Sequence, residues 1–402
     1  MFLNSKIIKK FRINWTNNSI KYLSREKKAI IKSLDDAIPF TQGKYLNDFE
    51  KKFKKYLTSK SAYAVSNGSN ALDLSAILID TNPEDEIIVP AHTWCASAIS
   101  FARFGAKIIW ADINPSTLVI SIDSIKKLVT KNTKAIIVVH LYGVPADMKA
   151  IMTFAKKNKI IIIEDCAQAL GASIGNKKVG TFGDISIFSF HSNKIITTLG
   201  EGGMLVVNNS IFNKNISALR HNGVYPFKRK KADYYWKPAM TNIIKAHKNY
   251  WPHNYCLGEI QCAIGAELLK RVDSLNRIRI KRAIKFKKAM KKFPELIFQK
   301  TPKNYKNVYH CLVASYFGKN ARKKRDLFIK TISKKYEIKA IVQNCPLNRY
   351  PLFKKFKSKY KLKNTDNFFD TMISWPFYTY MSEKNFDYMI SSTQKVLLNL
   401  RN

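Results

Sequence analysis

Short apolar segments alternate with segments of helical periodicity between residues 61 and 208, and this alternation constrains the fold more than any other feature. The apolar segments are rich in Ile and Val, and several are apolar on both faces, as buried strands are. They lie at residues 63–65, 86–89, 107–110, 135–141, 160–164, 185–190 and 204–207. Helical spacing occurs between them at residues 70–79, 93–104, 123–129 and 147–158. The alternation predicts crossover units, and therefore an α/β fold with a largely parallel sheet flanked by helices.

The pattern changes after about residue 254. A helix is expected at residues 259–275, followed by a very basic segment at 277–292 and then by mixed strand and helix signals. A loop starting at Trp375-Pro376-Phe377 precedes a terminal helix at residues 383–400. We predict an N-terminal arm at residues 1–30, a large domain at residues 31–255 and a smaller C-terminal α/β domain at residues 256–402.

The formal net charge of +42 invites a nucleic-acid interpretation. The cations are mostly Lys and are spread along the whole chain, whereas base-reading modules concentrate Arg and aromatic residues on one element, so nucleic acid is an unlikely partner. The densest cluster, residues 227–231, could attract a polyanionic substrate such as a nucleotide diphosphate, although such runs are more often solvated loops.

No apolar run reaches the roughly 18 residues that cross a bilayer, so we expect a cytoplasmic protein without membrane insertion. The 6 Cys have no CxxC spacing and no His partners at metal-binding distance in the sequence. We therefore predict reduced thiols and no metal site.

Two turns carry candidate chemistry, and each allows two interpretations. Gly68 and Ser69 lie in a small-residue turn between a strand and a helix, where backbone N–H groups could bind a phosphate or the polar residues could simply cap the helix. Asp165 follows the hydrophobic strand at 160–164. Its carboxylate could hold a proton on a heterocyclic cofactor nitrogen, or it could cap the next helix.

Lys194 favours the chemical interpretation. It ends a short polar loop after the strand at residues 185–190 and precedes Gly200-Glu201-Gly202-Gly203. A lysine beside an apolar strand end is suited to a Schiff base, because desolvation lowers its pKa and frees the amine. Ser189 is placed at the same strand end to contact a phosphate.

With these residues in view, the chain resembles the DegT/DnrJ/EryC1/StrS family of sugar aminotransferases, which have pyridoxal-phosphate (PLP) fold type I. The resemblance covers nearly the whole chain and rests on many short motifs in the right order. The strongest are Glu164-Asp165-Cys166-Ala167-Gln168-Ala169-Leu170-Gly171-Ala172, Gly183-Asp184, Ser189-Phe190-His191, Lys194, Gly200-Glu201-Gly202-Gly203, Arg220-His221-Asn222-Gly223 and His253-Asn254-Tyr255.

The resemblance implies a role for each matching residue. Lys194 would carry PLP as a Schiff base and later move the proton, Asp165 would pair with the pyridine nitrogen, and Gln168 would lie near the ring and its phenolic oxygen. Trp94 would stack on the ring, unless it is an ordinary core residue.

The phosphate would be held by Gly68, Ser69 and Ser189, with Asn254 reaching it from a neighbouring subunit, which implies a homodimer with shared active sites. Three departures limit the transfer. Asn67-Gly68-Ser69 replaces the family's Ser-Gly-Thr, Cys166 replaces Ala, and Asn254-Tyr255-Cys256-Leu257 lacks the Arg of Asn-Tyr-Arg-Met. The missing Arg removes a cation near the substrate.

The resemblance implies transfer of the amino group of L-glutamate to a keto sugar, which we expect to be a nucleotide-linked keto-deoxysugar. The product would serve the biosynthesis of lipopolysaccharide, O-antigen, capsule or another glycan. A cyclitol (inosose) acceptor is a close alternative. A sugar dehydratase on the same fold is more distant, because those relatives replace the cofactor lysine with His. A basic binding protein or regulator without catalysis is the alternative from another class, and only the charge supports it.

Overall fold

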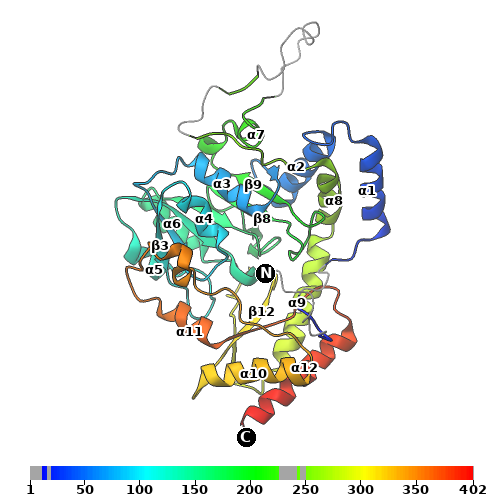
Figure 1. The fold of residues 1–402 in the computed structure, drawn as a ribbon, viewed down its shortest axis with the longest axis vertical. Helices are drawn as coiled ribbons and strands as arrows, with labels where there is room; N and C mark the ends of the chain where they lie inside the picture. The colour runs from blue at the N-terminus through cyan, green and yellow to red at the C-terminus, as the bar shows by residue number, and fades with distance from the viewer. Residues whose placement is uncertain (1–10, 16–19, 226–241, 245–249, 402) are drawn as a thin grey trace.

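A seven-stranded sheet lies at the centre of the larger part of the molecule, with strand order β1-β9-β8-β5-β4-β2-β3 (Figure 1). The structure is a computed structural model and describes residues 11–15, 20–225, 242–244 and 250–401, so the basic cluster at 227–231 lies outside the described residues. Neighbouring strands are parallel except for β9, which runs antiparallel to β1 and β8. The strands are β1 Tyr63–Val65, β2 Glu86–Pro90, β3 Lys107–Ala111, β4 Thr133–Val139, β5 Ile161–Asp165, β8 Ile185–Ser189 and β9 Gly203–Val207. The predicted α/β fold with a mostly parallel sheet is confirmed.

Three of the helices between the strands begin at polar caps. The side chains of Asn67, Ser121 and Asp147 accept hydrogen bonds from backbone N–H groups in the first turns of α3, α5 and α6, and such caps satisfy donors that the helix leaves unpaired. The helices of this part are α1 Ser24–Asp36, α2 Lys44–Leu57, α3 Gly68–Leu78, α4 Ala96–Ala102, α5 Ile122–Leu128, α6 Met148–Lys157, α7 Ile216–Leu219 and α8 Glu259–Leu269. The expected helix at 93–104 is shorter than predicted, because the chain turns at 91–95 before α4 begins.

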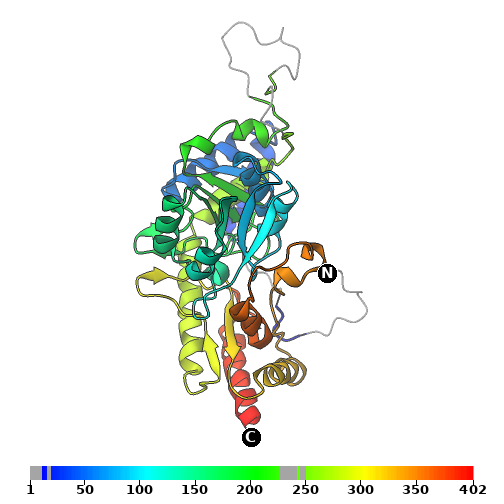
Figure 2. The ribbon, with the colours of Figure 1, turned by 90° about the vertical axis from the view of Figure 1, so that its left-hand side faces the viewer.

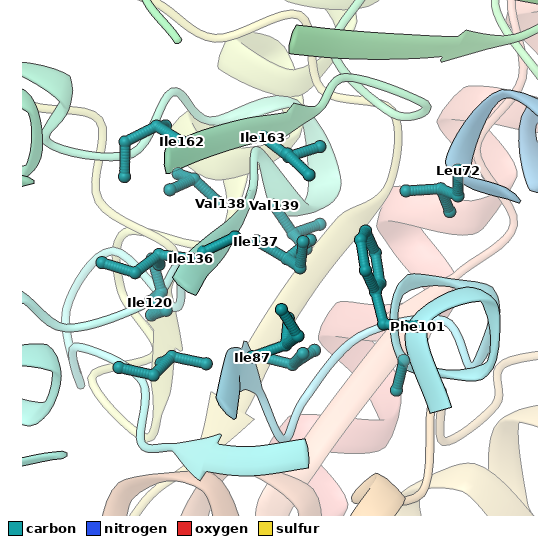
Figure 3. Close-up of a cluster of buried hydrophobic side chains, with 14 of the residues drawn as sticks. Leu72, Ile87, Phe101, Ile120, Ile136, Ile137, Val138, Val139, Ile162 and Ile163 are labelled. Atoms are coloured by element: carbon teal, nitrogen blue, oxygen red, sulfur yellow. The ribbon is translucent and has the colours of Figure 1, made fainter. Parts of the chain in front are cut away.

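The core of the sheet consists of consecutive apolar residues that are buried on both faces. Ile136, Ile137 and Val138 on β4 all have 0% exposure. Figure 3 shows them beside side chains of β2 and β5, with Leu72 of α3 and Phe101 of α4 on one side. Because helices cover both faces, these strands carry no alternating polar residues. Burial of this kind is the main favourable contribution to folding.

The smaller part is built on an antiparallel sheet of order β10-β12-β13, and Trp375 at the end of β13 is fully buried in its core. Its elements are β10 Leu296–Phe298, β12 Leu312–Tyr316, β13 Met372–Trp375, α10 Ala321–Lys335, α11 Lys363–Thr371 and α12 Glu383–Arg401. The long helix α9 (Val272–Ala289) runs from the larger part into the smaller one (Figures 1 and 2). The single helix expected at 259–275 is therefore wrong in extent, since the chain turns at Lys270-Arg271 and the basic segment continues as α9.

Packing changes along α9 rather than at the predicted boundary between residues 255 and 256. Val272 and Leu275 pack in the core that includes α2 and α8, whereas Ala283 and Phe286 pack with the smaller sheet. The predicted domain ranges remain predictions. At the other end of the chain, Ile13 forms a bridge with Ile338 of the smaller part.

Three very short strands had no detectable sequence signal and form a small separate sheet: β6 Ser173–Ile174, β7 Lys177–Lys178 and β11 Tyr305–Lys306. Short 3-10 helices lie at Leu141–Gly143, Ser210–Phe212, Leu347–Arg349 and Pro351–Phe353. Among the residues that the structure describes, no helix has both the length and the apolar character needed to span a bilayer.

Candidate active site

A cavity of about 490 Å³ opens where β4, β5 and β8 end. Parallel α/β sheets bind ligands at this edge, because the loops that follow the strands diverge there. The larger part contributes a set of residues that we call the floor: Gly68, Ser69, Trp94, Asp165, Gln168, Ser189 and Lys194. The structure thus brings together every residue that the sequence predicted for the site except Asn254.

Asp165 is the last residue of β5, and only 5% of it is exposed. The Ser97 hydroxyl donates to its Oδ2 at 2.7 Å, and the Ala167 N–H donates to its Oδ1 at 3.1 Å. Both contacts fix the direction of the carboxylate. The residue does more than cap a helix, since no helix begins at 166–168. A fixed buried carboxylate at the cavity edge can hold a proton on a ring nitrogen.

The N-terminus of α3 meets the end of β8 at the cavity. The helix begins at Gly68, two residues before the predicted start, so Gly68 and Ser69 lie in its first turn. Asn67 caps the N–H of Asn70, and the first N–H groups of the helix face the cavity edge. A Cβ on Gly68 would lie 3.1 Å from the Cβ of Ser189, so glycine allows the helix to approach the strand end. A helix N-terminus with a nearby hydroxyl can bind a phosphate.

Lys194 lies in the loop that joins β8 to the antiparallel strand β9. The loop is closed by its own backbone, with hydrogen bonds from Phe190 N–H to Gly202 O at 2.7 Å and from Ser192 N–H to Gly200 O at 2.8 Å. A Cβ on Gly203 would lie 2.4 Å from the backbone carbon of Asn67, so this close packing requires glycine. Burial lowers the pKa of Lys194, while Asp165, Cys311 and Glu201 oppose that shift. A lowered pKa makes more of the amine available as a nucleophile and base.

Gln168 is oriented by the backbone of Tyr142. The Tyr142 N–H donates to Gln168 Oε1 at 2.8 Å, which leaves the Gln168 Nε2 amide as a donor at the cavity. Tyr142 has a φ of 61°, a left-handed conformation that few non-glycine residues adopt. The strained backbone of Tyr142 is therefore the same backbone that orients Gln168 and turns its Nε2 donor toward the cavity.

Two of the predicted site residues, Trp94 and Asn254, are exposed. Trp94 lines the cavity with 61% of its surface exposed, so it is not an ordinary core residue. Asn254 is exposed and is not among the residues that line the cavity of its own chain. Its Oδ1 accepts a hydrogen bond from the nearby Cys256 N–H at 3.0 Å.

The smaller part contributes residues that the sequence did not reveal. We call this set the wall, and it consists of Arg279, His310, Cys311, Gln343, Asn344, Phe377 and Tyr378. Trp15 of the N-terminal arm also lines the cavity. Burial, Lys194 and Arg279 lower the pKa of His310 well below 6.5, so this imidazole is neutral. These residues come from separated segments of mixed periodicity, and no local pattern connects them.

A buried cluster of His140, Glu164 and Cys166 has ligand atoms close enough for a metal ion. His140 and Glu164 are already hydrogen-bonded within the protein. His140 Nδ1 accepts from Ala146 N–H at 3.0 Å, so the proton lies on Nε2, which donates to Glu164 at 3.0 Å. Glu164 also accepts from the N–H groups of Gly180, Phe182 and Gly183 at 2.7–2.8 Å. The cluster supports the turn at 180–183.

The floor fits PLP by the chemistry of its donors. It combines a lysine with a lowered pKa, a fixed buried carboxylate, an amide donor and a helix N-terminus beside a serine. These groups match the aldehyde, ring nitrogen, phenolic oxygen and phosphate of that cofactor. The fold and the site therefore place the protein among fold type I PLP proteins.

The chain belongs to the DegT/DnrJ/EryC1/StrS aminotransferase family, whose sequence profile it matches over residues 22–394. The predicted family and cofactor are confirmed. The chain is 36% identical over 259 residues to a GDP-perosamine synthase of Vibrio cholerae, an alignment that covers 64% of this chain and 65% of that protein, less than two thirds of its length. It is 31% identical over 343 residues to a GDP-perosamine synthase of Escherichia coli O157:H7, covering 84% of this chain and 86% of that protein.

Solved structures show the same fold over nearly the whole chain. Helicobacter pylori PseC, an aminotransferase involved in the biosynthesis of pseudoaminic acid, superposes with a TM-score of 0.86 at 25% identity. The alignment covers 96% of this chain and 99% of that one. An aminotransferase from Psychrobacter cryohalolentis superposes with a TM-score of 0.85 at 26% identity, covering 97% of this chain and 100% of that one.

Proposed function

We propose that the protein transfers the amino group of L-glutamate to a nucleotide-linked keto-deoxysugar, for the biosynthesis of a surface polysaccharide or another glycan. The observation that carries the proposal is that Lys194 and Asp165 line one cavity beside the N-terminus of α3, which has the geometry of a phosphate site. Family membership supports the reaction type, and the names of the perosamine synthases support a GDP-linked acceptor.

Asp165, Lys194 and Gln168 each have a task in this reaction. PLP, when bound, supplies the electron sink that stabilises negative charge at the reacting carbon. Asp165, held by Ser97 and Ala167, keeps the proton on the ring nitrogen. Lys194 Nζ takes a proton from the carbon of the amino donor and later delivers one to the sugar carbon. Gln168, oriented through its Oε1, would donate a hydrogen bond from Nε2 to the phenolic oxygen of the cofactor.

We also propose a homodimer in which Asn254 completes the phosphate site of the partner. Asn254 is exposed and lies outside its own cavity, while Trp94 at the cavity edge and Trp251 are 61% and 91% exposed. Co-expressing Lys194→Ala chains with Asn254→Ala chains tests this arrangement. Mixed dimers should contain one site with both residues intact and regain activity that neither parent has. Mixed dimers as inactive as both parents would overturn the shared site.

The cytoplasm remains the proposed location. It is supported by the 6 cysteines, all of which are free in the structure.

The absorption spectrum of the holoprotein tests the reaction most directly. Addition of L-glutamate should bleach the yellow cofactor band, and a GDP-linked keto-deoxysugar should then restore it. A yellow protein whose absorption band does not change with L-glutamate would rule out L-glutamate as the amino donor. Protein that bleaches with glutamate but recovers only with an inosose would favour the cyclitol alternative. A protein that never acquires the band would favour the basic binding protein.

A further inference from the structure

The backbone that orients Gln168 belongs to a turn whose conformation needs support. Tyr142 lies in the 3-10 helix Leu141–Gly143 and has a φ of 61°. A left-handed backbone costs energy for a residue with a Cβ, so it persists only where the surroundings hold it. The position of the Tyr142 N–H, which donates to Gln168 Oε1 at 2.8 Å, therefore depends on what holds Tyr142.

A buried hydrogen bond holds the side chain of Tyr142. Its hydroxyl lies 2.8 Å from His92 Nε2, and both residues have 0% exposure. His92 follows closely on β2, which ends at Pro90. The intervening Ala91 N–H donates to Ala111 O of β3 at 3.0 Å, so the segment is still paired with its neighbour. The partner of the Tyr142 hydroxyl is thus attached to the central sheet.

The smaller part covers this pair with an aromatic ring. Phe368 of α11 lies edge-on to His92, with ring centroids 5.1 Å apart and an interplanar angle of 88°. Its centroid lies 6.4 Å from that of Tyr142, and only 3% of Phe368 is exposed. The rings shield the hydrogen bond between the other two side chains from water, and a shielded hydrogen bond is electrostatically stronger than one in water.

The imidazole of His92 is a costly group at this place. Burial lowers its pKa to about 3, so the ring is neutral. A neutral imidazole has one N–H and one acceptor nitrogen, and Nδ1 has no partner among the described residues. An unpaired polar atom in the core costs stability that an apolar ring would avoid. The hydrogen bond to Tyr142 is therefore what His92 provides and a Phe at this position could not.

The smaller part also packs on the backbone of the same turn. Val308 N–H donates to Gly143 O at 3.1 Å, and a Cβ on Gly143 would lie 2.8 Å from Tyr309 N. Arg279 holds this segment from its other side, with Nε donating to Tyr309 O at 3.0 Å and Nη2 to Phe377 O at 3.1 Å. The turn is thus fixed by backbone contacts on the side of the smaller part and by the Tyr142 side chain on the side of the larger part.

We infer that His92 and Tyr142 are positioning residues for Gln168. The imidazole holds the phenol, the phenol holds the left-handed backbone, and the backbone N–H orients the amide that faces the cavity. Neither His92 nor Tyr142 lines the cavity, so both act through Gln168. This inference rests on the proposed function, because it assumes that Gln168 Nε2 donates to the phenolic oxygen of PLP.

The pH midpoint of the cofactor absorption band measures this contact without measuring turnover. A hydrogen bond donated to the phenolic oxygen competes with the proton that this oxygen shares with the lysine nitrogen, so its loss should raise the pH at which that proton leaves. In the holoprotein, Gln168→Ala should raise the midpoint by about one unit, the size of one ordinary hydrogen bond. His92→Phe and Tyr142→Phe should each raise it by about half a unit, because the donor remains but is held less firmly.

Combined variants and a conservative replacement separate positioning from other effects. In Gln168→Ala protein, neither His92→Phe nor Tyr142→Phe should raise the midpoint further, because all of these changes act through one contact. His92→Gln keeps a polar group for the Tyr142 hydroxyl, and its midpoint should lie close to that of wild type.

Trp110→Phe is the control for general structural damage. It removes a buried hydrogen bond from Trp110 Nε1 to Phe356 O at 2.7 Å, on β3 and away from the cavity lining. Urea unfolding of the apoprotein should show a loss of stability in this variant, as in Tyr142→Phe. Its cofactor band should keep the wild-type midpoint.

Three results would overturn the inference: unchanged midpoints in His92→Phe and Tyr142→Phe, shifts that add in full to that of Gln168→Ala, or an equal shift in Trp110→Phe. If His92→Phe does not fold, Tyr142→Phe removes the same hydrogen bond and carries the test. An unchanged midpoint in Gln168→Ala would instead refute the task proposed for Gln168, and the inference with it. Failure of the inference alone is therefore distinguishable from failure of the proposed function.

Discussion

The floor and the wall of the cavity are assembled in different ways. Most floor residues lie between residues 165 and 194, at the ends of β5 and β8 and in the loop after β8, and short backbone contacts hold them. The wall joins segments near residues 279, 310, 344 and 377 through buried side chains such as Arg279. The floor carries Lys194 and Asp165, whereas the wall presents neutral groups apart from an internally paired guanidinium. The groups that can move or hold a proton in the proposed reaction therefore lie on the floor.

Lys194→Ala should have the largest effect and should abolish both halves of the reaction. Losing a positioned general acid and base reduces turnover by about a thousandfold or more. Steady-state turnover and the cofactor band measure the loss. Lys319→Ala, which removes an exposed lysine, is the control and should be fully active. Turnover retained in Lys194→Ala would show that the floor does not perform the chemistry.

Asp165→Asn should slow both halves by about a hundredfold, the size typical of removing one preorganised electrostatic group. The amide is isosteric but cannot keep a proton on the ring nitrogen. Single-turnover rates with L-glutamate and with the sugar should fall together. Asp123→Asn at an exposed position is the matched control. A loss confined to the sugar half would show that Asp165 acts on the sugar and not on the cofactor ring.

Arg279→Lys should lower the free energy of unfolding by about 2 kcal/mol, because an ammonium cannot reach the separated carbonyl groups that the guanidinium pairs. Urea unfolding measures this change. Arg322→Lys changes an arginine with 68% side-chain exposure and should be nearly neutral. If Arg279→Lys is as stable as wild type, Arg279 is not a structural link, and a direct role toward the substrate becomes the better explanation.

Ser189→Ala should weaken PLP binding about tenfold, within the range for a hydrogen bond to a charged group. Equilibrium dialysis measures cofactor retention, and Ser210→Ala provides an exposed serine as control. Unchanged cofactor affinity would indicate that the N-terminus of α3 binds the phosphate without help from Ser189.

The smallest effect concerns the stability of the apoprotein. Lys194 has a lowered pKa in the folded state, so between that value and the ordinary 10.5 the unfolded chain binds more protons. Charging the buried amine therefore lowers the free energy of unfolding of wild type as the pH falls, and this loss of stability disappears as the pH rises. Lys194→Met lacks it. The stability advantage of Lys194→Met over wild type should therefore shrink as the pH approaches 10.5, and a pH-independent difference would contradict the burial of the charged amine.

The sequence predicted the floor well because its signals are local. The strands β5 and β8 are each marked by buried Ile residues, Asp165 is the last residue of β5, and Lys194 follows β8 within a few residues. The helix at 259–275 was wrong in extent because apolar periodicity continues across the turn at Lys270-Arg271 into α9. The wall left no signal, since His310, Asn344 and Phe377 lie in irregular segments with unrelated patterns.

By itself, the sequence determined the α/β class, the order of the strands along the chain and the residues at the carboxyl ends of β5 and β8. Periodicity and strand-end chemistry are properties of neighbouring residues, so a linear pattern can record them. Only the tertiary structure decided that Tyr142 orients Gln168, and that Arg279 joins the segments at 310 and 377. Those contacts join residues that are distant in the chain, and packing of the two cores brings them together.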